Sequence, residues 1–115
     1  MAIRLLLLWT TVNGMKRWID DEAIECLALN IYHESRSESR LSQFAVTQVV
    51  FNRINSPRFP DNVCGVVKEG LYEGNHPLRN RCQFSWYCDG HNDDPVDLVA
   101  WGDAVELATW MFTAR

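Results

Sequence analysis

Apolar residues recur at helical spacing from Trp18 to about Arg36, and this pattern predicts the first helix. The inward residues lie three and four positions apart: Ile24, Leu27, Ala28 and Ile31. Residues at that spacing share one helix face, so we expect them to pack into the core. The acidic residues 20–22 open the segment, where the helix dipole favours negative charge. The polar run 35–39 ends it.

A second helix is expected from about Leu41 to Ile54, where two prolines soon afterwards stop the pattern. Ser39 or Ser42 is its expected N-cap. One side is expected to carry Phe44, Ala45, Val49 and Asn52, flanked by Val46 and Val50.

The middle of the chain is expected to hold one short helix and two irregular segments. Asp61 is the expected cap of a helix from Asn62 to about Glu69, with Gly70 as its C-terminal stop. Residues 70–81 are rich in Gly, Asn, His and Pro, which predicts a loop. The aromatic segment 82–88 is expected to be extended or a structured loop.

A last helix is expected to reach about Phe112, with Asp94 as its cap and Pro95 in its first turn. Its expected inward residues are Val96, Val99, Ala100, Ala104, Leu107, Ala108 and Met111. The 115 residues therefore predict one mainly α domain with minor β structure. We expect that domain to span residues 18–115, preceded by an N-terminal segment at residues 1–17.

The N-terminal segment has no clear period, and its longest apolar run, Ile3 to Trp9, is too short to span a bilayer. It is either a weak export signal or an arm packed on the core. The net charge of −4 argues against a nucleic-acid partner, because such a protein needs a basic face. Five tryptophans suit a core, and they also suit stacking on sugar rings.

Four cysteines, Cys26, Cys64, Cys82 and Cys88, allow three disulfide pairings, which the sequence leaves open. A zinc site is the alternative, with His91 joining the last three cysteines. Their spacing lacks the tight cysteine pair that is typical of zinc sites.

Glu34 breaks the apolar pattern of the first helix. It lies three residues after Ile31 and seven after Leu27, so its carboxyl is expected at the end of the apolar stripe. Desolvation there would raise its pKa, as a general acid near neutral pH requires. The alternative is an ordinary surface carboxylate that pairs with Arg36 or Arg53.

Three segments together resemble the spore-cortex-lytic SleB/CwlJ type of cell wall hydrolase, over about residues 25–111. They read CLALNIYHESRSES at 26–39, AVTQVVFNRINSPRFPDNVCGVV at 45–67 and CQFSWYCDG at 82–90. They occur in the family's order and spacing. The E-A-R-G-E motif of the family reads here Glu34-Ser35-Arg36-Ser37-Glu38, with serines in place of its usual Ala and Gly.

The resemblance implies a compact fold like that of lysozymes and lytic transglycosylases. It also implies cleavage of peptidoglycan between N-acetylmuramic acid and N-acetylglucosamine. The family's catalytic Glu maps onto Glu34. The residues expected to bind the glycan are Glu38, Gln83, Phe84, Ser85, Trp86 and Asp89. No metal and no organic cofactor is implied, and we expect a monomer without a membrane span.

A single acid favours a lytic transglycosylase, in which the muramoyl 6-hydroxyl closes a 1,6-anhydro ring. Simple hydrolysis would need a water held by Asp89 or Glu38. A glycan-binding module that does not cut is the competing expectation, because the family continues with a D-x-T-x-G-A-x-x-Y-like segment and this sequence ends at Arg115. A zinc-dependent amidase or peptidase is a third possible function. The expected place of action is the periplasm or cell wall, reached by export or, for a phage lysin, through a holin pore.

Overall fold

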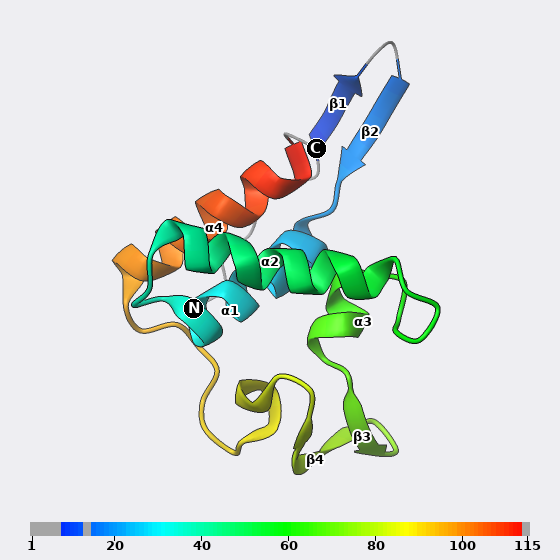
Figure 1. The fold of residues 1–115 in the computed structure, drawn as a ribbon, viewed down its shortest axis with the longest axis vertical. Helices are drawn as coiled ribbons and strands as arrows, with labels where there is room; N and C mark the ends of the chain where they lie inside the picture. Colours follow the sequence, from blue (N-terminus) through cyan, green and yellow to red (C-terminus); the bar gives the residue numbers. More distant parts are fainter. Residues whose placement is uncertain (1–7, 13–14, 114–115) are drawn as a thin grey trace.

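Four helices form the body of the domain in a computed structural model, which describes residues 8–12 and 15–113. The helices are α1 (Asp21–Ser35), α2 (Arg40–Ile54), α3 (Val63–Val67) and α4 (Leu98–Thr113). α1 packs against each of the other three (Figure 1). Its expected inward residues, Ile24, Leu27, Ala28 and Ile31, are all buried in the core.

Two small antiparallel sheets accompany the helices, so the expected class, mainly α with minor β, is confirmed. β1 (Leu8–Val12) pairs with β2 (Met15–Ile19). β3 (Gly70–Glu73) pairs with β4 (His76–Cys82). The two hairpins extend from different parts of the helical body (Figure 1). No helix in the described ranges has the length and apolar content of a membrane span.

The first helix begins later than expected, because residue 18 belongs to β2. The N-cap is Asp20, whose Oδ1 accepts hydrogen bonds from the backbone N–H groups of Glu22 and Ala23 at 3.0 and 3.2 Å. Capping by this short acidic side chain sets the helix start. Residues 1–7 and 13–14 of the expected N-terminal segment lie outside the described residues, and the division of the chain near residue 18 stays a prediction.

α2 starts where it was expected, with Ser39 as N-cap, and the side that carries Phe44, Ala45, Val49 and Asn52 is mostly exposed. The buried residues are Gln43, Thr47 and Val50, while Ala45, Val49 and Asn52 are exposed. Gln43 Nε2 donates to the carbonyl of Ser35 at 3.1 Å, and Thr47 Oγ1 donates to that of Phe44 at 2.6 Å. Polar side chains are tolerated in a core when they are hydrogen-bonded in this way.

The prediction of a loop over residues 70–81 is wrong, because this segment forms the β3–β4 hairpin. Glu73 pairs with His76, which leaves Gly74 and Asn75 as the two-residue turn. Gly74 has φ +61°, a conformation that glycine adopts without strain. The preceding helix, α3, is also shorter than expected and is capped by Asn62, whose Oδ1 accepts from Gly65 N at 2.7 Å.

The last helix begins at Leu98, not after Pro95, because Asp97 is its cap. Asp97 Oδ1 accepts from Ala100 N at 3.1 Å, and its carbonyl accepts from Trp101 N. Val96 and Val99 are therefore exposed, contrary to the expected inward face, and Trp101 is buried instead. Of the other expected inward residues, Ala100 is half-buried, and Ala104, Leu107, Ala108 and Met111 are buried.

Two disulfides link elements of the fold. Cys26–Cys64 joins α1 to α3, and Cys82–Cys88 joins the end of β4 to a short 3₁₀ turn, η1 (Ser85–Cys88). The alternative zinc set with His91 is wrong, because its three thiolates are consumed in these bonds. Of the two alternatives for residues 82–88, the structure has the structured loop, because η1 occupies residues 85–88.

Candidate functional site

Glu34 lies in the last turn of α1, and its side chain is exposed. The predicted desolvation by the apolar stripe is therefore wrong. Ser35 takes the inward position: it is buried, and its Oγ donates to the carbonyl of Ile31 at 2.9 Å. The chain then leaves the helix through the connection to α2, which carries the exposed Glu38. The helix end thus presents two carboxylates to solvent, Glu34 from α1 and Glu38 from the connection.

The aromatic segment after β4 is anchored on the last two turns of α1. Trp86 Nε1 donates to the buried Oδ1 of Asn30 at 2.9 Å. The ring of His33 stacks on Trp86 with centroids 4.6 Å apart, and its Nε2 donates to the carbonyl of Asp93 at 2.8 Å. Asn30 is one helical turn before Glu34, so Glu34 projects from the side of α1 on which Trp86 is seated.

Phe84 and Trp86 are each only 7% exposed, and their expected part in binding the glycan stays a prediction. Both rings belong to the hydrophobic core, and Trp86 directs its indole N–H toward α1. Gln83 and Ser85 are exposed beside them, and Asp89 is half-buried with its Oδ1 accepting from His91 N at 2.9 Å. The buried rings therefore support the exposed polar side chains next to them.

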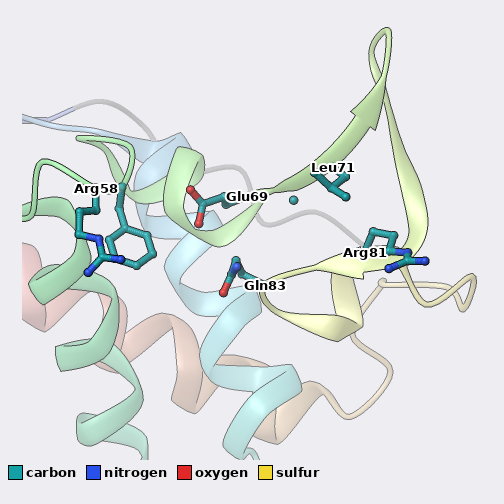
Figure 2. A pocket seen from close by; sticks show the side chains of 7 residues that line it. Arg58, Glu69, Leu71, Arg81 and Gln83 are labelled. Atoms are coloured by element: carbon teal, nitrogen blue, oxygen red, sulfur yellow. The ribbon is translucent and has the colours of Figure 1, made fainter.

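A pocket of about 400 Å³ lies between the α2–α3 connection and the β3–β4 hairpin (Figure 2). Its lining residues are Arg58, Phe59, Glu69, Gly70, Leu71, Arg81 and Gln83. Of the glycan-binding residues expected from the sequence, this pocket contains only Gln83. Arg81 lies in the segment that the sequence predicts as a loop, although the Gly-Asn pair at 74–75 is a hairpin signal. Arg58 and Glu69 carry no local signal that links them to this pocket.

The sequence model of the cell wall hydrolase family matches residues 37–115. The chain belongs to the cell wall hydrolase family. The resemblance drawn from its sequence motifs is thereby confirmed. The matched range contains Glu38, the pocket and the aromatic segment, while Glu34 lies three residues before it.

Curated relatives agree with the family assignment over a short region. The chain is 49% identical over 51 residues to a spore cortex-lytic enzyme of Halalkalibacterium halodurans. The matching region covers 44% of this chain and 16% of that protein. It is 46% identical over 48 residues to a spore cortex-lytic enzyme of Bacillus subtilis, covering 42% of this chain and 16% of the relative. The chain thus matches about a sixth of these relatives' length. No solved structure gives a significant match.

Trp86→Phe tests whether the Asn30–Trp86 hydrogen bond anchors the segment that carries Gln83 and Ser85. The variant keeps an aromatic ring but leaves the buried Oδ1 of Asn30 without its donor. We expect the free energy of unfolding to fall by about 1–3 kcal/mol, measured by urea denaturation. Trp110→Phe is the control, because Trp110 is 53% exposed. Equal losses in both variants would contradict the anchoring role.

The carboxyl of Asp93 gives the protein a pH-dependent stability. Burial raises the pKa of Asp93, partly opposed by His33. Its ionised form therefore opposes folding above the ordinary Asp pKa. We expect Asp93→Asn to stabilise the protein at pH 7 by less than about 1 kcal/mol, because the carboxyl is well screened by solvent. The gain should vanish below about pH 3.9.

Urea denaturation at pH 7 and pH 3.5 measures this effect, with Asp103→Asn as control. A stabilisation by Asp93→Asn that persists unchanged at pH 3.5 would contradict it.

Proposed function

We propose that this cell wall hydrolase cleaves the glycan strand of peptidoglycan between N-acetylmuramic acid and N-acetylglucosamine. Glu34 acts as its general acid. The family match and the names of the relatives support a substrate in the cell wall. The observation that carries the assignment to Glu34 is its place in the last turn of α1, exposed and on the side where the aromatic segment is anchored. A rigid helix end suits a catalytic group, because the geometry of the reacting atoms must be held closely.

In the proposed reaction, the protonated Glu34 carboxyl donates its proton to the glycosidic oxygen as the bond to muramoyl C1 breaks. Positive charge then develops on the muramoyl ring. The 6-hydroxyl of that residue attacks C1, and the Glu34 carboxylate accepts the hydroxyl proton. A 1,6-anhydro end is left. Gln83 and Ser85 supply polar side chains for the sugars, and a sugar lying against the acid excludes water from it.

Hydrolysis is the variant of this mechanism in which water attacks C1 instead. It needs a second carboxylate to hold the water, and Glu38 and Asp89 are the candidates. We favour transglycosylation because it needs only the one acid. The mass of the released muropeptides distinguishes the two reactions, because 1,6-anhydro products are one water lighter than reducing ones.

A module that binds glycan without cutting it is the alternative. Wild-type protein that sediments with purified peptidoglycan but releases no soluble product would establish that function. The proposed place of action is the cell wall, and export or release through a phage holin pore are both routes to it.

Removal of metal ions tests the amidase or peptidase alternative. Proton transfer by a carboxyl needs no metal. We therefore expect the rate of peptidoglycan solubilisation in about 5 mM EDTA to stay within about twofold of the untreated rate. A metal-dependent amidase would lose its activity, and readdition of zinc would restore it. Such a loss and recovery would contradict the proposed mechanism.

A further inference from the structure

The pocket behind Gln83 carries positive charge in a protein whose net charge is −4. Arg58 and Arg81 lie at its opposite ends, with Glu69 and Gln83 between them (Figure 2). Both arginines are exposed, and neither guanidinium forms an ion pair with any described residue. The Nη1 atom of Arg53 is buried without a hydrogen-bond partner in the described part of the chain. The guanidinium of Arg53 lies over the rings of Phe59, which lines the pocket, and Phe84.

The walls of the pocket are held in place by the backbone. Gly70 pairs with Cys82, and a Cβ on Gly70 would come within 2.7 Å of the carbonyl oxygen of Arg81. Gln83 N donates to the carbonyl of Glu69 at 2.9 Å, and the Cys82–Cys88 disulfide ties this corner to η1. The side chains of Arg81 and Gln83 therefore start from positions that the hairpin defines.

The chemistry of the lining fits a short peptide with two carboxylates and one ammonium group. Guanidinium groups bind carboxylates through paired hydrogen bonds. The Glu69 carboxylate can accept an ammonium group, and the Gln83 amide can bond to the peptide backbone. Phe59 and Leu71 add apolar wall that suits small side chains such as that of alanine.

We propose that this pocket binds the peptide that peptidoglycan carries on its muramic acid. Arg58 and Arg81 hold the peptide's carboxylates, and Glu69 holds the ammonium group of its diamino acid. The proposal rests on the proposed function, because it takes the substrate to be peptidoglycan. The pocket would be a second region of contact with the substrate, beside Glu34. Residues 83–86 connect the two regions, because they run from the side of α1 that carries Glu34 to the pocket. The enzyme would accordingly prefer glycan strands that still bear their peptides.

The test compares two substrates, peptide-bearing glycan and glycan stripped of its peptides by an amidase. For wild type and for the double variant Arg58→Ala and Arg81→Ala, kcat/KM on peptide-bearing glycan is divided by kcat/KM on stripped glycan. We expect the ratio to fall by about five- to tenfold, from the loss of two solvent-exposed charge contacts. The effect should weaken as salt is raised. Arg79→Ala is the matched control, because it removes a charge from the same strand outside the pocket lining, and it should keep the wild-type ratio.

An unchanged ratio in the double variant would overturn the proposal, and so would an equal loss on both substrates with a normal thermal unfolding profile. Direct titration with a synthetic stem tetrapeptide gives a readout that needs no cleavage. If wild type cuts neither substrate but binds the tetrapeptide more tightly than the double variant, the proposed cleavage fails while the peptide pocket stands. If wild type and the double variant bind the tetrapeptide equally tightly, the pocket proposal is wrong, whether or not the protein cleaves glycan.

Discussion

Replacement of Glu34 by Gln is expected to slow peptidoglycan cleavage by roughly 10²–10⁴-fold. The amide has nearly the same shape as the carboxyl but cannot deliver a proton to the glycosidic oxygen. The side chain is exposed on the last turn of α1, so the free energy of unfolding should change by less than about 0.5 kcal/mol. The rate is measured as the loss of turbidity of a peptidoglycan suspension, and stability by urea denaturation.

Glu22→Gln is the matched control, because it makes the same isosteric change at the other end of the same helix, also at an exposed position. It should cut at the wild-type rate, although the loss of an acidic residue in the first turn costs about 0.3–1 kcal/mol of stability. A Glu34→Gln protein that is folded and still cuts within about threefold of wild type would remove Glu34 from the mechanism.

Removal of the Cys26–Cys64 disulfide is expected to have the largest effect on stability. The bond closes a sequence separation of 38 residues and joins the central helix α1 to α3. The chain-entropy relation gives a loss of about 4 kcal/mol for the variant with both cysteines replaced by alanine. Because a small domain has a total stability of about 5–15 kcal/mol, this variant should unfold at much lower denaturant concentration.

The Cys82–Cys88 disulfide is the internal comparison for this prediction. It spans a sequence separation of only 6 residues, so its removal should cost about 2 kcal/mol by the same relation. Urea denaturation of both double-alanine variants gives the two losses. If removal of Cys82–Cys88 destabilises the protein as much as removal of Cys26–Cys64, loop closure is not the main source of the stabilisation.

Those parts of the fold that depend on local pattern could be predicted from the sequence. The inward stripe of α1 follows from residues three and four apart. A serine cap for α2, at Ser39 or Ser42, follows from side chains beside a helix start, and the structure has Ser39. The face of α2 could not be found in this way. Gln43 and Thr47 are inward because carbonyls of Ser35 and Phe44 accept their hydrogen bonds, and a hydropathy pattern scores both residues as outward.

The same distinction applies to the candidate site. The position of Glu34 near the C-terminal end of α1 follows from helical phase, but its exposure depends on how the chain turns after Ser35. The burial of Trp86 depends on a partner, Asn30, that is far away in the sequence. The pocket brings Arg58 from one connection together with Arg81 from a hairpin strand, and no local pattern links the two.

Mass spectrometry of the products from purified peptidoglycan tests the central claim most directly, because it shows which bond is broken. The proposed function predicts soluble muropeptides with new 1,6-anhydro ends on muramic acid from wild type, and none above background from Glu34→Gln. Reducing muramic acid ends would keep Glu34 as the acid but replace transglycosylation by hydrolysis. Products cut at amide or peptide bonds, or no soluble product from folded wild-type protein, would contradict glycan cleavage by this domain.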